Sequence, residues 1–358
     1  MIKNTSMKVA GLAIASVIAL TGCAANEGNG SVDGLSGTLN GAGSSAMGSA
    51  QEAWIAAFQT ANGAVTINYD PTGSGAGRES FISGAVNFAG SDSYLKDEEL
   101  ALTFAACAPG TTPFEVPVYI SPIAVVFNVE GVTDLNLDAA TIAGIFKGDI
   151  TMWNDSAIAD LNPGAKLPAA AITAVHRSDD SGTTKNFSDY LSKTAESIWG
   201  TDVSDVFPYE SGEGAKGTSG VIDAVKNGTN TIGYADASKA GDLSIAKLKV
   251  GEEFVELSNA SAAAIVDASP AVEGRDASDL AIKIDRATTA AGAYPLVLVS
   301  YLIGCNEYAD AEVGKLVKAY ATYLVSEQGQ ADAAQFAGSA PLSATLTSKV
   351  AAVIAAIK

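Results

Sequence analysis

The apolar stretch that decides the fold is Glu115–Phe127, which reads EVPVYISPIAVVF. Prolines at positions 117 and 122 interrupt it, and β-branched residues, which favour strands, make up much of the remainder. A strand of this length can serve two sheets in succession. A second long apolar run, Ala293–Ile303, reads AYPLVLVSYLI and occurs much later in the chain. Two such runs around a central block predict that the chain leaves one lobe, builds a second and then returns.

Shorter β-branched runs alternate with helical stretches over the rest of the chain, which is typical of α/β units around a mostly parallel sheet. A length of 358 residues suits two lobes of ordinary size. Strands are expected at Leu35–Leu39, Val65–Tyr69, Val86–Ala89, Ala171–Val175 and Thr231–Tyr234, and helices from Met47 and at Ala139–Phe146, Thr183–Ile198, Ala311–Val325 and Ser343–Ile357.

Four polar segments resemble parts of an anion site. They are Gly41–Ser45, Gly73–Gly75, Gly90–Asp92 and Arg177–Thr183. The first three follow predicted strands, and open α/β sheets bind ligands at the carboxyl ends of their strands. Backbone N–H groups and hydroxyls near a helix start can donate to an anion. Each segment taken alone also fits an ordinary turn or helix cap.

Two side chains in these segments carry most of the chemical information. Asp92 tolerates an anion beside it only if the anion still carries a proton, as phosphate does near neutral pH and sulfate does not. Arg177 offers a planar fork suited to an oxyanion, and Asp179 can accept from it and hold it in place. The alternatives are that Asp92 is a cap or turn residue and that Arg177 belongs to a surface loop with a local ion pair.

The N-terminus predicts a lipoprotein signal peptide at residues 1–22. Lys3 and Lys8 precede an apolar run, Val9–Leu20, that is too short to span a bilayer. The sequence Leu-Thr-Gly-Cys ending at Cys23 resembles the bacterial lipobox, in which the cysteine becomes diacylated. Residues 23–36 predict a flexible linker. We therefore expect an extracytoplasmic protein anchored to the cell membrane through Cys23; the alternative is a plain secretory signal.

The remaining cysteines and the histidine limit the possible chemistry. Cys107 and Cys305 are left as a candidate disulfide in an oxidising compartment, with two buried free thiols as the alternative. His176 is the sole histidine, and no Cys/His grouping has metal-ligand spacing, so we expect no metal and no cofactor. The formal charge of −19 argues against nucleic acid or an anionic membrane surface as a partner, and any anion must be held by local dipoles and hydrogen bonds.

Several motifs together resemble the phosphate-binding protein of the bacterial high-affinity phosphate ABC transporter, and the lipobox and the candidate Cys107–Cys305 pair resemble its versions from high-GC Gram-positive bacteria. These motifs are Gly41–Ser45, Gly90–Asp92, Gly148–Asp155, Leu161–Gly164, Arg177–Thr184, Ile232–Tyr234 and Tyr294–Pro295. They occur in the family's order across nearly all of the chain after the signal peptide.

The resemblance implies a type II periplasmic-binding-protein fold of class α/β, with two α/β lobes joined by two crossing strands and the ligand in the cleft. Residues 37–119 and 297–358 would form lobe I, and residues 120–296 lobe II. The implied phosphate ligands are Ser44, Ser45, Ala46, Ser74, Asp92, Arg177, Ser181, Gly182 and Thr183, with Asp179 pairing with the arginine. Ala46 departs from the family, because many relatives carry phenylalanine there. The implied partners are inorganic phosphate and the permease subunits of the transporter, and we expect a monomer.

The main rival is a serine hydrolase or phosphatase that uses Ser181. A serine nucleophile needs a base within hydrogen-bond reach. His176 is the neighbour of Arg177 on a predicted strand, so it should point to the opposite face. We therefore expect a binding protein and not an enzyme. A binding protein for another oxyanion or a phosphonate, and a phosphate sensor or scavenger without a transporter, remain open alternatives.

Overall fold

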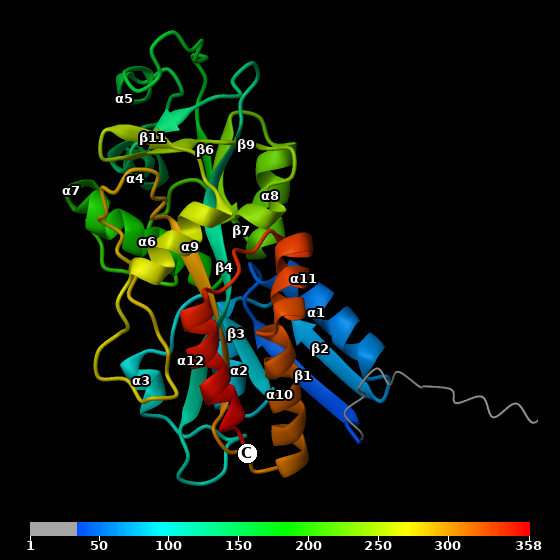
Figure 1. Ribbon diagram of the computed structural model, residues 1–358. Helices are drawn as coiled ribbons and strands as arrows, with labels where there is room; N and C mark the ends of the chain where they lie inside the picture. Colours follow the sequence, from blue (N-terminus) through cyan, green and yellow to red (C-terminus); the bar gives the residue numbers. More distant parts are fainter. Residues whose placement is uncertain (1–33) are drawn as a thin grey trace, which may run out of the picture. The chain divides into compact units, whose positions relative to one another are not determined.

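The computed structural model describes residues 34–358. The predicted signal peptide, Cys23 and most of the predicted linker lie outside the described residues. Among the described residues, nine strands form one sheet in the order β2-β1-β3-β12-β4-β8-β6-β7, with β9 also paired to β4. Helices pack around this sheet (Figure 1). The α/β class and the two central strands expected from the sequence are therefore confirmed.

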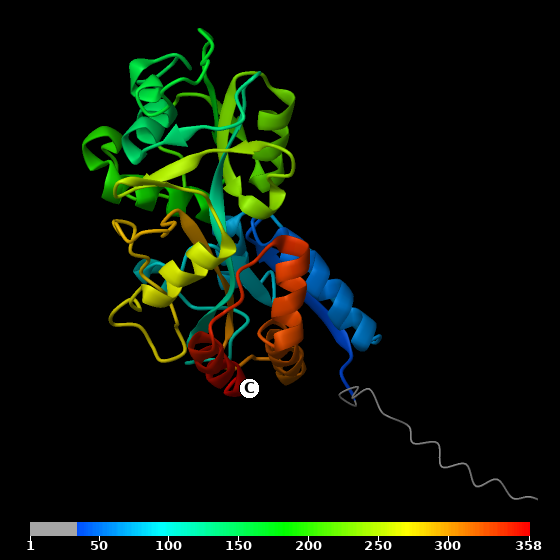
Figure 2. The same ribbon diagram turned by 45° about the horizontal axis from the view of Figure 1, so that its top comes forward.

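Strand β4 (Pro113–Asn128) runs through both lobes (Figures 1 and 2). It pairs antiparallel with β12 (Val297–Cys305) as far as Pro122 and with β8 (Thr231–Asp236) from Ile123 onward. Every residue of β4 except Asn128 is buried. The apolar run thus belongs to both halves of the sheet. Its residues up to Pro122 pair with a strand of lobe I, and those from Ile123 onward pair with a strand of lobe II.

The two prolines of β4 stand where the hydrogen-bond ladder is irregular. Pro117 pairs with Tyr301 at a register shift between Ser300 and Tyr301. Because proline has no N–H to give to a ladder, strands tolerate it at such bulges. Pro122 is the last residue paired with β12 before the strand changes partner. The prolines that interrupt the sequence pattern therefore mark the bulge and the change of partner.

Lobe I contains the N-terminal strands and the C-terminal helices. Its strands and first helices are β1 (Gly37–Gly43), α1 (Gly48–Ala61), β2 (Val65–Asp70), α2 (Ser74–Ile82), β3 (Phe88–Ser91) and α3 (Asp97–Leu100). The chain returns in α10 (Ala311–Leu324), α11 (Glu327–Ala337) and α12 (Ala344–Ala355). Helices α1 and α11 lie side by side, and the fully buried Trp54 donates its indole N–H to the Gly329 carbonyl at 2.6 Å.

Lobe II is built on β6 (Thr173–Arg177), β7 (Glu213–Ala215) and β8, with β9 (Ser244–Ile245) beside β4. Its helices are α4 (Ala139–Lys147), α5 (Ser156–Ala159), α6 (Gly182–Thr194), α7 (Glu196–Trp199) and α8 (Gly217–Asn227). Helix α9 (Asn259–Ala268) packs against β4, and its C-terminal end lies across a hollow from the start of α12 in lobe I. A small second sheet has the order β11-β10-β5, formed by β5 (Asn136–Leu137), β10 (Lys247–Val250) and β11 (Glu253–Val255). Phe187 of α6 stacks on Tyr234 of β8 with ring centroids 4.1 Å apart, which fixes the helix on the sheet.

The strands predicted at Val86–Ala89 and Ala171–Val175 are each displaced by two residues toward the C-terminus, and two other predicted elements differ more. The first strand covers Gly37–Gly43 and not Leu35–Leu39, because its end pairs with β2 on one side and β3 on the other. Gly43 lies so close to β3 that a Cβ there would stand 1.9 Å from the Gly90 carbonyl oxygen. The single helix expected over Thr183–Ile198 is two helices, because the backbone leaves the helical region at Ala195.

The predicted lobe boundaries, at 119/120 and 296/297, remain a prediction. Ser278 and Leu280 fall inside the range predicted for lobe II, yet they bond to the lobe I portion of β4. The N–H of Glu115 donates to the Ser278 carbonyl at 3.0 Å, and the N–H of Leu280 donates to the Glu115 carbonyl at 2.8 Å. The returning segment therefore contacts lobe I before β12 begins.

The predicted disulfide between Cys107 and Cys305 is confirmed. Cys305 is the last residue of β12, and Cys107 lies in the connection between α3 and β4; both are buried. The bond joins the segment before β4, which leads out of lobe I, to the end of β12, which leads back into it. The two cysteines are 198 positions apart in the sequence.

Replacing both cysteines (C107S/C305S) should lower the free energy of unfolding. Closing so long a loop in the unfolded chain stabilises the folded state by several kcal/mol, about 5 at most in the chain-entropy model. Guanidinium denaturation under non-reducing conditions measures the change, with reduced wild type as the control. An unchanged midpoint in the double variant would contradict this expectation.

Candidate functional site

Three helix N-termini meet around Asp92. The loop before α1 supplies Ser44, whose hydroxyl donates to Asp92 Oδ1 at 2.5 Å. Helix α2 begins with Ser74, whose hydroxyl oxygen accepts the Asp92 N–H at 3.0 Å. Helix α6 supplies Thr183, whose hydroxyl lies 3.5 Å from Asp92 Oδ2. Segments far apart in the sequence and from both lobes therefore converge on Asp92, two of them at its carboxylate and the third at its backbone N–H.

The two oxygens of Asp92 have unequal surroundings. Oδ1 accepts from Ser44 and also from Ser300 at 2.7 Å, whereas Oδ2 has only the long contact with Thr183. The side chain is 3% exposed. Burial raises the pKa of Asp92, and the hydrogen bonds from Ser44, Ser300 and Thr183 offset this only in part. The sequence reasoning missed Ser300, although a lone serine within a buried apolar strand was a usable signal.

Arg177 and Asp179 form the pair expected from the sequence. Arg177 ends β6 and is buried, and its Nε donates to Asp179 Oδ1 at 2.7 Å while a second guanidinium nitrogen bonds Oδ2. Asp179 also accepts the N–H of Gly217 at 3.0 Å. Burial alone would raise the pKa of Asp179, but Arg177 more than offsets it, so the pKa lies below its ordinary value. The guanidinium is thus held in a fixed plane.

The start of α6 is packed directly against lobe I. Ser181 caps the helix, because its hydroxyl oxygen accepts the N–H of Thr184 at 3.1 Å. At Gly182 a Cβ would lie 2.5 Å from Ser74 Oγ and 2.7 Å from Asp92 Cβ. Only glycine allows this approach, which brings the α6 terminus against the α2 terminus.

Ser45 and Ala46 complete the predicted set. The Ser45 hydroxyl lies 3.1 Å from the Thr218 hydroxyl and accepts the Thr218 N–H at 3.1 Å. Thr218 lies in the first turn of α8 in lobe II, and the sequence reasoning did not identify it. Ala46 is completely buried. All predicted segments therefore lie at the same interface between the lobes, while their roles toward a ligand remain a prediction.

The geometry does not support the serine-hydrolase alternative. The His176 ring stacks on Phe207 with centroids 3.9 Å apart, and its Nδ1 lies 3.0 Å from the Arg177 carbonyl oxygen. The Ser181 hydroxyl serves as a helix cap. Neither contact joins the serine to the histidine.

Within residues 34–358, no cluster of His, Cys, Asp and Glu side chains could hold a metal ion. No described helix is both long enough and apolar enough to cross a membrane.

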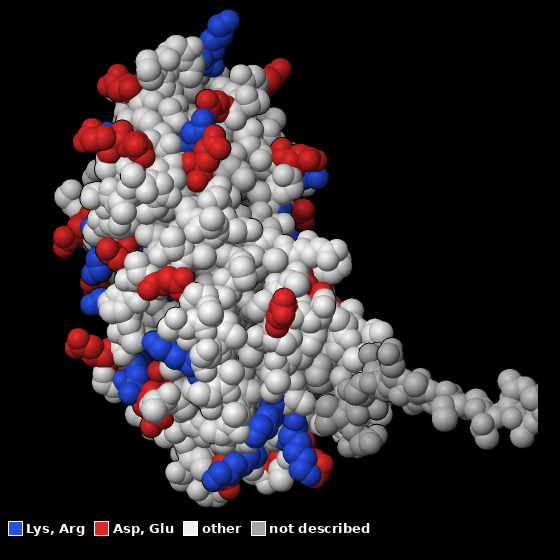
Figure 3. Space-filling model, in the orientation of Figure 1, with Lys and Arg blue, Asp and Glu red and all other residues white. Residues whose placement is uncertain are grey.

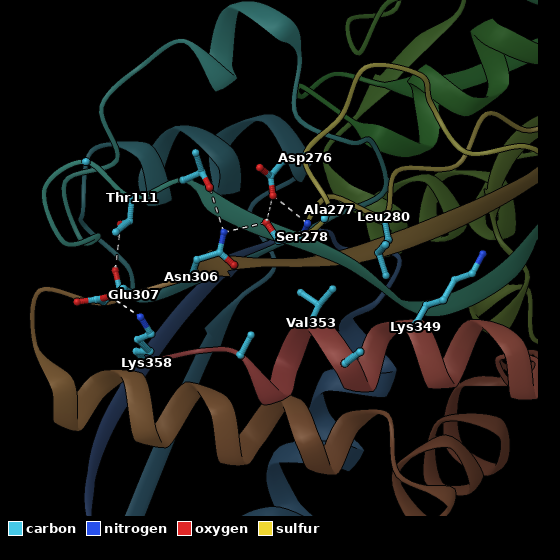
Figure 4. A pocket seen from close by; sticks show the side chains of 14 residues that line it. Thr111, Asp276, Ala277, Ser278, Leu280, Asn306, Glu307, Lys349, Val353 and Lys358 are labelled. Carbon is cyan, nitrogen blue, oxygen red and sulfur yellow. Dashed lines mark hydrogen bonds and ion pairs between the residues drawn. The ribbon is translucent and has the colours of Figure 1, made fainter.

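The charged side chains of the surface and a hollow beside α12 lie outside the group of residues around Asp92. On the face shown in Figure 3, acidic side chains are spread over both lobes, and basic ones gather toward the end near α10 and α12. A hollow of about 750 Å³ lies beside α12 (Figure 4). Its polar groups bond one another, since Asn306 donates to Ser278 at 2.8 Å and Ser278 to Asp276 at 2.9 Å. Asn306, Ser278 and Asp276 thus bond one another within the lining.

Comparisons with known proteins agree with this geometry. The family model described as "PBP superfamily domain" matches residues 30–328, so the chain belongs to the superfamily of periplasmic binding proteins. A crystal structure of a phosphate-binding protein from Stenotrophomonas maltophilia is similar in fold, with a TM-score of 0.71 and 20% identity over 88% of this chain and 94% of that one.

Curated relatives define the family more narrowly. The phosphate-binding protein PstS 3 of Mycobacterium leprae is 38% identical over 292 residues, which cover 79% of this chain and 77% of that protein. The phosphate-binding protein PstS 2 of Mycobacterium tuberculosis is 33% identical over 366 residues, covering 97% of each. The chain belongs to the PstS family.

A second buried carboxylate, Asp236, lies where β4 changes partner. The Tyr119 hydroxyl lies 3.2 Å from both of its oxygens, and the Ser238 N–H donates to Oδ1 at 2.9 Å. Burial raises the pKa of Asp236 from 3.8 to about 6. The Asp236 carboxyl group therefore binds its proton more tightly in the folded protein than in the unfolded chain. The resulting stabilisation is complete below the ordinary pKa and is lost as the pH rises through about 6.

Asp236→Asn should remove this pH-dependent contribution, because asparagine is neutral at every pH tested. A pKa change from 3.8 to about 6 corresponds to at most about 3 kcal/mol. From pH 7 to pH 4, the wild type should gain up to this amount of unfolding free energy relative to D236N, as measured by urea denaturation. Asp223→Asn, on the exposed side of α8, is the control. Parallel pH profiles for wild type and D236N would show this assignment to be wrong.

Proposed function

We propose that this protein binds inorganic phosphate in the cleft around Asp92, outside the cytoplasmic membrane, and delivers it to an ABC permease as its solute-binding protein. The names of the PstS relatives support this proposal. The observation that carries it is a buried carboxylate, Asp92, enclosed by hydroxyls from both lobes and by the N-termini of α1, α2 and α6.

The proposed ligands supply enough hydrogen bonds for tight binding. They are Ser44, Ser45, Ala46, Ser74, Asp92, Arg177, Ser181, Gly182 and Thr183, through side chains or backbone N–H groups. Hydrogen bonds to charged groups contribute about 1.5–3 kcal/mol each before ordering costs, and micromolar affinity needs only about −8 kcal/mol in total. Helix N-termini add favourable dipoles without adding net positive charge.

Asp92 would select phosphate over sulfate. Its Oδ1 already accepts from Ser44 and Ser300, so Oδ2 is the oxygen with capacity to accept a P–OH proton. Sulfate has no proton near neutral pH and would place a lone pair against a desolvated carboxylate. Leaving a buried charge unpaired in this way costs several kcal/mol. Selectivity would therefore come from repulsion of the wrong anion and not from a difference in size.

Asp92→Asn should weaken discrimination against sulfate more than it weakens phosphate binding, because asparagine can donate as well as accept. Arg177→Ala should weaken binding of both anions, since the guanidinium contacts any oxyanion. Titration calorimetry of phosphate-stripped protein with phosphate and with sulfate measures both effects. Wild-type protein that binds sulfate as tightly as phosphate would refute the assignment of Asp92 and the choice of ligand.

The proposal includes a lipid anchor at Cys23. The support is the lipobox-like sequence that ends at Cys23 after a short apolar run, followed by a linker rich in glycine, asparagine and serine. An acylated protein would remain at the outer surface of the membrane, close to the permease that receives its phosphate.

Cys23→Ala should abolish incorporation of radiolabelled palmitate in cells and release the protein to the medium, because the acylated residue is lost. The C107S/C305S variant retains Cys23 and should be labelled like wild type, which makes it the matched control. Labelling of C23A at the wild-type level would refute the anchor.

A further inference from the structure

Asp205 belongs to lobe II but directs its side chain onto lobe I. It lies in the connection between α7 and β7 and is 3% exposed. Its Oδ1 accepts from the Ser93 hydroxyl at 2.8 Å. Its Oδ2 lies 2.9 Å from Lys96 Nζ and 3.4 Å from a guanidinium nitrogen of Arg78. These three partners precede or follow β3 in lobe I, so one carboxylate spans the interface between the lobes.

The main chain of the same residue supports the anion site. The carbonyl oxygen of Asp205 accepts the N–H of Ser181 at 2.9 Å. Ser181 caps α6, whose first residues, Gly182 and Thr183, meet Asp92. Asp205 therefore joins lobe I to the helix terminus that we propose holds phosphate, although its side chain is engaged elsewhere.

The surrounding charges favour an ionised carboxylate. Burial alone would raise the pKa of Asp205, but the positive charges of Arg78, Lys185 and Lys96 more than offset it, so the pKa lies below its ordinary value. A charge-assisted hydrogen bond between buried or half-buried groups is stronger than one between neutral groups. The contacts of Asp205 are thus among the stronger ones between the lobes.

Arg78 does not need Asp205 in order to be paired. Its Nε bonds the two carboxylate oxygens of Glu99 at 2.9 and 3.1 Å, and another nitrogen bonds the Ser91 hydroxyl at 3.1 Å. These partners all belong to lobe I. Separation of the lobes would leave Arg78 neutralised but would strip the Asp205 carboxylate of its lobe I partners. The Asp205 contacts therefore exist only while the lobes are together.

We propose that Asp205 is an interlobe latch, meaning a residue that holds the two lobes together over the bound anion without touching the anion. This inference rests on the proposed phosphate binding. Removing the latch favours separation of the lobes and so speeds release of phosphate. Association changes little, because every group that contacts phosphate remains.

Asp205→Asn tests the latch through the rate of phosphate release. Wild type and variant are loaded with radiolabelled phosphate and chased with unlabelled phosphate. We expect release from D205N to be at least about tenfold faster, with the association rate changed by less than about threefold. Asp202→Asn, at an exposed position in the same connection, is the matched control and should release phosphate at the wild-type rate.

Lys96→Gln provides a second test that does not disturb lobe II. Lys96 is 37% exposed, so its replacement should not prevent folding. We expect K96Q to speed release by a smaller factor than D205N does. The double variant should release phosphate no faster than D205N alone, because D205N already removes the ion pair with Lys96 that K96Q breaks. A purely local defect in the Asp205 loop would instead leave K96Q at the wild-type rate.

The outcomes separate this inference from the proposed function. Wild-type protein that fails to bind radiolabelled phosphate overturns the proposed function. Wild type that binds phosphate, with D205N and K96Q both releasing it at the wild-type rate, overturns the latch alone. A D205N/K96Q variant whose release rate rises by the product of the two single increases also overturns the latch, because the two residues would then act independently.

Discussion

A carboxylate held out of water between two lobes imposes the main constraint on this structure. Asp92 can be buried only because hydroxyls from lobe I and lobe II point at it, and Ser300 on a central strand supplies one of them. The approach of α6 to Asp92 in turn requires glycine at position 182. The positions of three helix termini are therefore linked to the satisfaction of a single buried charge.

The central strands make this arrangement possible. Because β4 pairs with β12 in lobe I and with β8 in lobe II, each lobe carries its own helix termini on a shared element. The partner changes between Pro122 and Ile123, and Asp236 lies opposite Ile123. A protein built in this way can hold an anion between two surfaces that belong to different lobes. Contacts such as those of Asp205 then influence how long the surfaces stay together.

Much of the fold was readable from the sequence because it depends on local pattern. The alternation of β-branched runs and helices, and the two long apolar runs, predicted the α/β class and the shared strands. Element ends were less accurate where pairing decided them. The last three residues of β1 include two glycines, Gly41 and Gly43, which favour a loop by propensity, yet this end of the strand pairs with strands on both sides. Helix α11 has an alanine-rich, polar sequence with a weak apolar face, and it was not anticipated.

The sequence by itself determined which chemical groups are available: a carboxylate after a strand, an arginine with its aspartate, and glycine and hydroxyl residues at helix starts. It could do so because capping and turn chemistry are fixed by residues close in sequence. Only the tertiary structure decided that Ser300 and Thr218 join these groups and that Asp205 crosses to Arg78 and Lys96. The physical reason is that contacts between lobes depend on the relative placement of distant segments, and no local periodicity records that placement.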